Sequence, residues 1–225
     1  MAETMRALRD APIFEGVSDR ILSDFTQSSR IRALEKGEIL FSQTDPADTV
    51  YIVRSGCIAI FLATLEGREL VINEMHRGDC FGELSLITDQ PRSTGALARE
   101  SSEVISIPRD VFLKGLEAEP ELMRRVLETT ALRLRVSSER ESALAFLDSS
   151  ARIAKVLLQL DQQADDEGVI SVTQEDLAQY VGLARQTVAQ TLGEWRRLGW
   201  VETGRVRIVV KDREALERLA SAIEG

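Results

Sequence analysis

The segment FGELSLITDQPRST, residues 81–94, combines the chemical groups that a pocket for an organic phosphate requires. Arg92 offers forked N–H donors, Ser93 offers a small hydroxyl, and the backbone N–H groups of residues 82–84 can be approached closely by a ligand. Glu83 would repel a bare phosphate, but its carboxylate suits a sugar hydroxyl while Arg92 takes the phosphate. The segment therefore favours a nucleotide, although a glycine turn with a surface Glu–Arg pair would have the same spacing.

The residues around this segment follow a β pattern. Short runs of β-forming residues extend from about Ile31 to Ile107, with glycine at positions 37, 56, 67 and 78 as turn signals. The runs cover Glu38–Phe41, Val50–Val53, Ile58–Leu62, Glu69–Met75 and Glu103–Ile107. This spacing predicts an N-terminal antiparallel β-roll of the jelly-roll type, preceded by a short helix that begins near Ser18.

The pattern becomes helical at about Arg109 and stays helical to about Phe146. Within it Met123, Thr130, Ser137 and Leu144 recur every seven residues, and Leu127, Leu134 and Glu141 each follow four residues later. Such heptad spacing predicts a long helix that pairs with a second copy of the chain along this seam. The polar Ser137 suits either a fixed helix register or contact with a ligand held between subunits.

After a joint at residues 148–150 the sequence predicts a helix from Ala151 to about Gln163 and an acidic surface loop from Asp161 to Gly168. Two short helices are predicted beyond this loop. Thr173 caps the first helix, and Gly182 ends it in the left-handed conformation that other residues resist. The second helix begins at about Ala184 and turns Val188 and Leu192 inward, as in a helix-turn-helix whose second helix enters the major groove. Its outward residues suit bases and phosphates, although they would also suit an ordinary solvated helix face: Arg185, Gln186, Thr187 and Gln190.

A basic hairpin is predicted behind these helices. Its strands are Trp200–Glu202 and Val206–Val210, its turn is Thr203-Gly204, and Arg205 with Arg207 forms a wing suited to the DNA backbone. The stretch from residue 183 to residue 211 contains six basic and two acidic residues, although the whole chain carries a net charge of −9. One basic face on an acidic protein is compatible with DNA binding. Thr191 departs from the motif, because such helices usually bury an aliphatic residue there.

The bulk composition predicts a cytoplasmic globular protein. Apolar residues make up 44% and charged residues 29% of 225 residues, and the N-terminus lacks the apolar run of a signal peptide. Cys57 and Cys80 are too far apart for a CxxC motif, so we expect no metal. We expect no contact with a membrane and no catalysis, since one histidine and no nucleophile–His–acid set are present.

Taken together, these motifs resemble the cyclic-AMP receptor protein (catabolite activator) and oxygen-regulator family of transcription factors. The cassette at residues 81–94 resembles the family's phosphate-binding cassette, and the resemblance extends over nearly the whole chain. Its other parts are Gly37-Glu38, Tyr51-Ile52-Val53 and Gly56 in the β-roll, residues 133–139 and 144–148 in the dimer helix and hinge, and the helix-turn-helix. The implied fold is α+β, with a cyclic-nucleotide-binding β-roll over residues 1–117, a dimerisation helix over residues 118–147 and a winged helix-turn-helix over residues 148–225.

The resemblance also implies a role for particular residues. Glu83 would bind the ribose 2′-hydroxyl, Arg92 and Ser93 the cyclic phosphate, and Ser137 of one subunit with Ser138 of the other the base. The implied ligand is cyclic AMP, with cyclic GMP left open, and the implied partners are a palindromic double-stranded DNA, RNA polymerase and a second copy of the chain. The full ligand set is Gly82, Glu83, Leu84, Arg92, Ser93, Ser137 and Ser138, and the DNA set is Thr173, Arg185, Gln186, Thr187, Gln190 and Arg205.

Several alternatives stay open at this point. A regulator of the same fold could sense cyclic di-GMP, bind haem through His76 or Cys80, or act without a ligand. An iron–sulfur cluster is disfavoured because two cysteines cannot supply four ligands. A protein-interaction module or an enzyme's regulatory subunit would be an alternative of another class. Gln186 and Gln190 depart from the Glu and Arg of the best-known family member, which leaves open the operator sequence beyond a guanine opposite Arg185.

Overall fold

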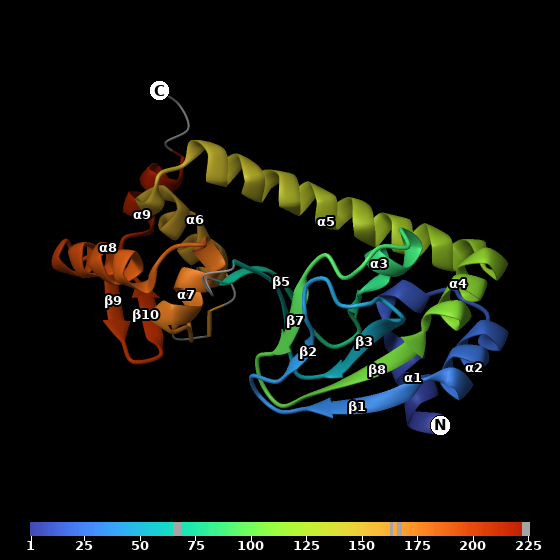
Figure 1. Cartoon of the computed structure of the whole chain (residues 1–225). Coiled ribbons are helices and arrows are strands. Elements are labelled where there is room, and N and C mark those ends of the chain that lie inside the picture. The colour runs from blue at the N-terminus through green and yellow to red at the C-terminus, as the bar shows by residue number, and fades with distance from the viewer. Residues whose placement is uncertain (65–68, 163, 166–167, 222–225) are drawn as a thin grey trace. The chain divides into compact units, whose positions relative to one another are not determined.

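The computed structural model describes residues 1–64, 69–162, 164–165 and 168–221, and the chain forms two compact units. The first unit comprises Met1–Gly67 and Val71–Arg135, and the second comprises Arg68–Leu70 and Val136–Gly225. The long helix α5 (Pro120–Phe146) contributes to both units (Figure 1). Among the described residues, no helix is both long and apolar enough to cross a membrane.

Two four-stranded sheets form the β-roll of the first unit (Figure 1). Their strand orders are β1-β8-β3-β6 and β2-β7-β4-β5, and β8 pairs antiparallel with β1 and β3 while β7 pairs antiparallel with β2 and β4. The predicted antiparallel β-roll is therefore confirmed. The strands are β1 (Arg30–Leu34), β2 (Ile39–Phe41), β3 (Thr49–Ser55), β4 (Ile58–Ala63), β5 (Glu69–Met75), β6 (Cys80–Phe81), β7 (Gly95–Ala98) and β8 (Ser102–Pro108).

Alternation along the central strands builds a core on each face of the first sheet. In β8, Ile105 and Ile107 are fully buried in a cluster that also contains helix residues, and Val104 is buried in the cluster shared with the second sheet. In β3, Ile52 and Val53 divide between the two clusters in the same way. A strand that is buried on both faces tends to have a continuous apolar run. β3 has such a run at Val50–Val53, whereas Glu103 and Ser106 interrupt the apolar residues of β8 at half-buried positions.

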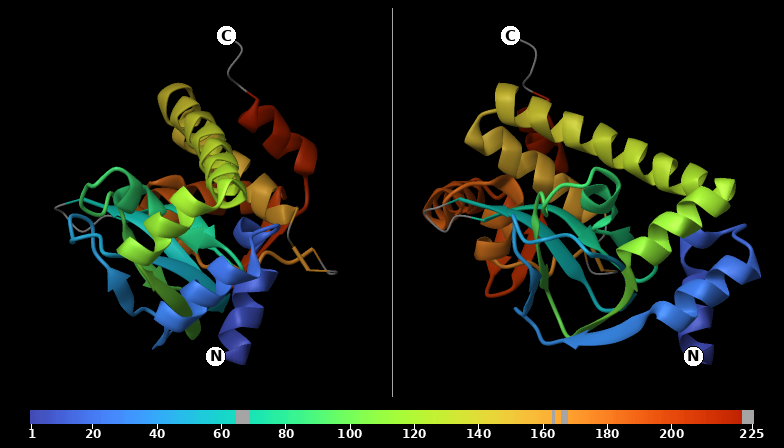
Figure 2. Two further views of the ribbon diagram at one scale, coloured as in Figure 1. Left: turned by 90° about the vertical axis from the view of Figure 1, so that its right-hand side faces the viewer. Right: turned by 45° about the vertical axis from the view of Figure 1, so that its right-hand side comes forward.

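Helices gather at one end of the first unit. They are α1 (Ala2–Asp10), the 3-10 turn η1 (Pro12–Phe14), α2 (Asp19–Ser28) and α4 (Arg109–Ala118), and Figure 2 shows the blue N-terminal helices beside the green α4. The ring of Phe25 joins them, with its centroid 5.5 Å from that of Phe14 and 6.1 Å from that of Phe112. The helix predicted near Ser18 is thus present as α2, whereas α1 was not predicted.

The helical pattern from Arg109 to Phe146 is divided between α4 and α5, and α5 lies within the dimerisation helix expected over residues 118–147. Glu119 adopts an extended conformation (φ −129°, ψ 97°) between α4 and α5. The next residue is Pro120, whose ring disfavours the helical conformation in the residue before it. The hydrophobic period continues across this break, which is why the pattern alone did not reveal it.

The second unit packs helices around a small hairpin. It contains the end of α5, α6 (Ser149–Asp161), α7 (Gln174–Val181), α8 (Arg185–Arg197), β9 (Val201–Gly204), β10 (Arg207–Val210) and α9 (Arg213–Ala220). Asp148 caps α6 by accepting a hydrogen bond from the Ala151 N–H at 2.8 Å, and Leu177, Val188, Leu192 and Trp195 fill the core. The acidic loop predicted between Asp161 and Gly168 falls partly outside the described residues.

Candidate ligand-binding and DNA-binding sites

Gly82 stands at the centre of the predicted ligand cassette. It joins β6 to the short helix α3 (Glu83–Ile87) with a left-handed φ of +82°, a conformation that side chains resist. A Cβ atom at this position would lie 2.6 Å from a guanidinium nitrogen of Arg92. Both the backbone conformation and the close approach of Arg92 therefore require glycine here.

Arg92 is buried within the cassette, with 3% of its surface exposed. One terminal nitrogen donates a hydrogen bond to the Gly82 carbonyl at 2.8 Å, and the other donates to the Thr49 carbonyl at 2.5 Å. The guanidinium carbon lies 4.3 Å from the ring centroid of Phe41 and 5.6 Å from that of Tyr51. Carbonyl dipoles and aromatic faces thus hold this cation in place.

The charge of Arg92 has no carboxylate partner in the described part of the chain, and its Nε is buried without a hydrogen-bond acceptor. Burial lowers the pKa of the Arg92 guanidinium from its ordinary value. A buried cation without a counter-ion is costly to the fold, and a bound anion would offset that cost. The arrangement is chemically suited to an anionic ligand.

Glu83 has a different environment, because Arg133 of α5 neutralises it. The carboxylate is 3% exposed and accepts a hydrogen bond from the Arg133 guanidinium at 2.8 Å. Arg133 also donates to the carbonyl of Cys80, so one side chain ties α5 to both β6 and α3. The structure therefore joins the cassette to the long helix through an ion pair within the first unit.

The other predicted ligand residues are exposed. Leu84 and Ser93 lie at the surface of the cassette. Ser137 and Ser138 are also exposed, but they follow the boundary after Arg135 and belong to the second unit. The structure thus brings Gly82, Glu83, Arg92 and Ser93 together in one unit, and the roles of the two serines of α5 stay predictions.

The predicted dimer seam is an exposed apolar stripe along α5. Met123, Leu127 and Leu134 are 52%, 68% and 67% exposed, and Ser137 is also exposed. Thr130 is half-buried and donates a hydrogen bond to the Val126 carbonyl within the helix. The side chain of Leu144 lies outside the described part of the structure.

The predicted helix-turn-helix is present as α7 and α8. Thr173 caps α7 by accepting a hydrogen bond from the Asp176 N–H at 3.0 Å, and Gly182 ends it with φ +66°. This cap occupies the Thr173 hydroxyl. Thr191 is 7% exposed and donates to the Thr187 carbonyl at 3.1 Å, so its methyl fills the core while its hydroxyl is satisfied.

The first turns of α8 present the predicted DNA-contacting residues. Arg185, Gln186 and Gln190 are exposed, and Thr187 is half-buried. Arg185 lies 4.0 Å from Glu175, with both side chains more than half exposed. Such a surface ion pair contributes little free energy, so the Arg185 guanidinium can exchange it for another partner.

The hairpin behind α8 has its turn at Arg205 and Val206, so the predicted turn at Thr203-Gly204 is wrong. Gly204 pairs with Arg207 as part of β9, and the strands are connected by the two residues between them. The β-branched Thr203 extends the first strand, and Gly204 stays in the ladder. Arg205 therefore sits at the exposed tip of the wing.

The comparisons with known proteins agree with this architecture. The model of the cyclic nucleotide-binding domain matches residues 31–119, and that of the Crp-like helix-turn-helix domain matches residues 151–219. A CRP-like cAMP-activated global transcriptional regulator from Mycobacterium tuberculosis is 32% identical over 219 residues, which cover 95% of this chain and 98% of the relative. The chain belongs to the CRP/FNR family of transcription regulators.

Other members of the CRP/FNR family match over similar lengths. The cAMP-activated global transcriptional regulator CRP of Salmonella typhimurium is 33% identical over 181 residues, covering 78% of this chain and 86% of the relative. The catabolite activator protein of Thermus thermophilus has a TM-score of 0.54 at 27% identity and covers 95% of this chain and 100% of its own. The c-di-GMP responsive regulator CLP of Xanthomonas campestris has a TM-score of 0.77 at 24% identity, over 86% of this chain and 99% of its own, and indicates the shared fold.

Arg133 had no predicted role beyond the dimer helix, whereas the structure shows it as the partner of Glu83. Its position held a usable signal, because Arg133 precedes Ser137 by one helical turn and so projects from the same face of α5. A buried Glu83 in a short helix also needs a cationic partner.

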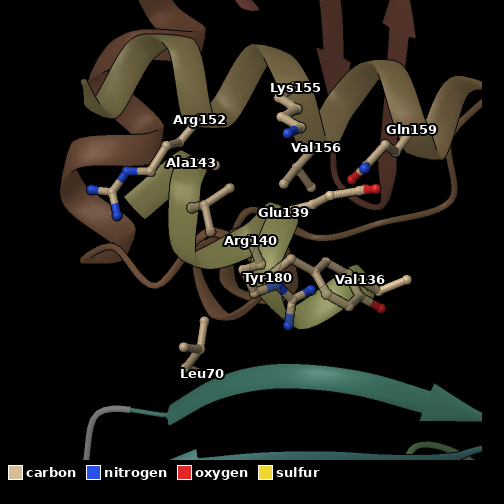
Figure 3. Close-up of a pocket in the computed structure, with 11 residues that line it drawn as sticks. Leu70, Val136, Glu139, Arg140, Ala143, Arg152, Lys155, Val156, Gln159 and Tyr180 are labelled. Carbon is tan, nitrogen blue, oxygen red and sulfur yellow. The ribbon is translucent and has the colours of Figure 1, made fainter. Parts of the chain in front are cut away.

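A separate pocket of about 120 Å3 lies in the second unit, where the end of α5 meets α6 and α7 (Figure 3). Side chains of α6, such as Lys155 and Gln159, point toward those of α5. The Nε of Arg152 is buried there without a hydrogen-bond acceptor in the described residues. The pocket borders the joint at residues 147–148, and its lining is Leu70, Val136, Glu139, Arg140, Ala143, Arg152, Lys155, Val156, Gln159, Tyr180 and Val181.

Proposed function

We propose that this chain is a homodimeric transcription regulator that binds cyclic AMP and is switched by it to a DNA-binding state. The observation that carries the proposal is the buried Arg92 guanidinium, which has carbonyls and aromatic rings around it but no carboxylate among the described residues. A cyclic phosphate supplies one negative charge and two exocyclic oxygens to such a forked donor. The relatives at 32% and 33% identity are both named as cAMP-activated.

The cassette would divide the nucleotide between two charged side chains. Arg92 has five N–H donors, of which two serve the carbonyls of Gly82 and Thr49. Its buried Nε–H has no acceptor among the described residues, and a phosphate oxygen bound in the cassette would supply one. Ser93 and the backbone N–H groups at Gly82 and Leu84 would complete the phosphate contacts. Glu83 would accept a hydrogen bond from the ribose 2′-hydroxyl with an acceptor position that Arg133 does not use.

The exposed seam of α5 supports a dimer. Three large apolar side chains on one stripe are more than half exposed: Met123, Leu127 and Leu134. A second copy packed on this stripe would remove them from water, and each leucine so buried contributes roughly 1.5–3 kcal/mol. Ser137 of one subunit and Ser138 of the other would then meet at the seam and contact the base of the nucleotide.

The DNA-binding halves of the two subunits would act as a symmetric pair. In a two-fold dimer, α8 of each subunit enters one major groove, so the operator is a palindrome with half-sites about 34 Å apart. Arg185, Gln186, Thr187 and Gln190 would read bases, while Arg205 on the wing contacts the backbone. RNA polymerase is the protein partner that we expect for the DNA-bound form.

Nucleotide binding can supply the free energy that a switch needs. A shift from 1:99 to 99:1 between two conformations requires about 5.5 kcal/mol of differential binding. Each charge-assisted hydrogen bond contributes roughly 1.5–3 kcal/mol, so two or three bonds made in only one conformation are sufficient. Arg133 links the cassette to α5 and offers a route by which ligand contacts bias the long helix.

Calorimetric titration of the full chain with cyclic AMP, cyclic GMP and cyclic di-GMP tests the ligand. We expect saturation by cyclic AMP at one nucleotide per subunit. Arg92→Gln removes at least two charge-assisted bonds, or about 3–6 kcal/mol, and should weaken binding more than about 100-fold. Arg20→Gln makes the same change on the exposed face of α2 and should leave binding unchanged.

The other outcomes decide the alternatives. Saturation by cyclic di-GMP alone would replace the ligand and leave the regulator assignment in place. Binding that is equal in Arg92→Gln and in the unaltered chain would overturn the proposed pocket. A fluorescence-anisotropy titration with operator DNA, with and without cyclic AMP, then tests the switch, and equal DNA affinity under both conditions would contradict it.

A further inference from the structure

Three side chains with different ligand chemistry converge on the second sheet of the β-roll. The Cys57 sulfur, a carboxylate oxygen of Glu74 and a ring nitrogen of His76 all lie within 4.8 Å of one another. Cys57 precedes β4 and His76 follows β5, and these two strands are neighbours in the sheet. His76 is the one histidine of the chain, and Cys57 is one of two cysteines.

The backbone on both sides of this cluster is fixed by hydrogen bonds. The N–H of Cys57 donates to the Ser102 hydroxyl at 3.1 Å, and its carbonyl accepts from the Arg99 N–H at 2.9 Å. The N–H of His76 donates to the Asp79 carboxylate at 2.8 Å, and its carbonyl accepts from the Asp79 N–H at 2.9 Å. Two of the three ligand positions are therefore held in place before any ion arrives.

The surroundings of the cluster favour a cation. Arg99 contacts Glu74 at 3.4 Å, in the position of an outer-shell group that orients a ligating carboxylate. The charged groups around Cys57 are the carboxylates of Glu74, Glu100 and Asp79 and the guanidinium of Arg99. The environment of the cluster therefore contains more negative than positive charge.

We propose that Cys57, Glu74 and His76 bind a divalent transition metal with the chemistry of Zn²⁺. Sulfur, imidazole and carboxylate are the three donor types that Zn²⁺ uses in proteins, and a soft sulfur with a ring nitrogen excludes Mg²⁺ and Ca²⁺ as preferred ions. Three protein ligands leave a fourth tetrahedral position for water. On binding, the Cys57 S–H bond breaks, the sulfur keeps the electron pair for the metal, and the proton passes to solvent.

The position of the cluster lets a metal ion enter from solvent, and loss of the ion should leave the fold intact. His76 is exposed, so an ion can enter from solvent, whereas Cys57 is only 9% exposed. The apolar core between the sheets already includes Ile58 and Met75, next to the ligands, and it does not depend on an ion. The metal-free chain should therefore fold, and metal binding can be measured on it directly.

The expectation of no metal came from the distance between the cysteines along the sequence. That distance excludes a CxxC site, but it does not consider partners contributed by neighbouring strands. Glu74 and His76 are separated from Cys57 by a whole β-hairpin, and only the pairing of β4 with β5 brings them together. The site is also distinct from the nucleotide cassette, since none of its three ligands is a proposed nucleotide contact.

Titration of the chelator-treated full chain with Co²⁺ tests the proposal, because a Co²⁺–thiolate bond gives a charge-transfer band in the near ultraviolet. We expect one Co²⁺ per chain and displacement by one equivalent of Zn²⁺. His76→Ala should bind at least about 100-fold more weakly, since even outer-shell changes at metal sites cost 10–100-fold. Cys57→Ser should lose the band, and Cys80→Ala, which removes the other cysteine, should keep it.

Each result has one interpretation. Absence of the band in the unaltered chain, or an equal band in Cys57→Ser, would overturn the site. Equal Co²⁺ affinity in His76→Ala and in the unaltered chain would also overturn it. His76 is exposed, so the histidine variant should fold even if the cysteine variant does not, and it decides the question alone. The titration contains no nucleotide or DNA, so its outcome is independent of the proposed regulatory function.

Discussion

At the scale of single residues, the cassette depends on groups whose charge is controlled by burial. Cys80 is only 3% exposed. It lies three residues before Glu83, which forms an ion pair with Arg133. Burial, and then the charge of Glu83, raises the pKa of the Cys80 thiol well above its usual value of 9.0. The folded chain therefore keeps the thiol proton at a pH at which the unfolded chain loses it.

This difference predicts a loss of stability in alkali. Above pH 9 the unfolded state binds fewer protons at Cys80 than the folded state, so the free energy of unfolding falls as the pH rises. At pH 10 the loss from this residue should be about 1.4 kcal/mol, the equivalent of one pKa unit. Urea unfolding at pH 8 and pH 10 measures it, and Cys80→Ala should show the smaller decrease. An unchanged decrease in Cys80→Ala would show that other groups cause it.

Arg185 belongs to the same scale, because one side chain is expected to select one base. We predict that selection from random DNA yields a guanine in each half-site, and that Arg185→Ala removes this preference. A bidentate Arg–guanine contact discriminates by about 1–3 kcal/mol, so the variant should lose roughly 5- to 150-fold in affinity for the selected site.

The control for Arg185 is Arg197→Ala, which removes an equal charge from the last turn of α8. That variant should weaken binding to all sequences to a similar extent and should keep the guanine, because phosphate contacts carry no sequence information. If Arg185→Ala retains the guanine preference, the predicted docking of α8 is wrong.

At the scale of elements, the ion pair between Glu83 and Arg133 fastens α3 and β6 to α5. Arg133→Leu leaves the Glu83 carboxylate buried without its cation, so the free energy of unfolding should fall. Removal of one partner of a buried pair costs about 3–5 kcal/mol, and we expect about 2–3 kcal/mol here because Arg133 is still 24% exposed. Urea unfolding of the full chain at pH 7 measures the loss.

A double-mutant cycle separates the pair from the packing around it. Glu83→Gln removes the charge that Arg133 neutralises, so Glu83→Gln with Arg133→Leu should be more stable than Arg133→Leu alone. Strictly additive losses would mean that the two side chains do not interact energetically. Coupling without any effect on nucleotide affinity would restrict the pair to a structural role.

The elements also show where sequence patterns succeed. β5 was predicted with its observed bounds, because it contains the strong β-formers Val71 and Ile72 and the turn residues Gly67 and Gly78 flank it in the sequence. β7 contains only Gly95, Ala96, Leu97 and Ala98, so it has almost no β signal and gains its place by pairing with β2 and β4. The hairpin turn at Arg205 was missed because the hydrophobic period does not fix where a strand ends.

The candidate sites also differ in how far the sequence alone predicts them. Glu83, Arg92 and Ser93 could be predicted as one candidate site because they share one short segment whose chemistry is visible in the sequence. Arg133 lies 50 residues beyond Glu83, so the fold had to bring them together before their pairing could be seen. Cys57 and His76 lie far apart in the sequence. Only strand pairing places them in one cluster with Glu74.

At the scale of the whole molecule, the proposed function requires a dimer. A single helix-turn-helix contacts one half-site, and two-fold symmetry doubles the contact and defines the operator spacing. The base contacts assigned to Ser137 and Ser138 also require two copies of α5. The proposal therefore predicts that dimerisation along the exposed stripe governs both nucleotide binding and DNA binding.

Leu127→Glu tests this dependence. In a symmetric dimer the change removes two buried leucines, worth roughly 1.5–3 kcal/mol each, so dimerisation should weaken by roughly 100- to 10,000-fold. Leu132→Glu is the matched control, because Leu132 is 66% exposed on the same helix but lies about 140° around it from Leu127. Sedimentation velocity should give a monomer for Leu127→Glu and a dimer for Leu132→Glu, with operator binding lost only in the first. If both variants remain dimers, the two copies meet on a surface other than this stripe.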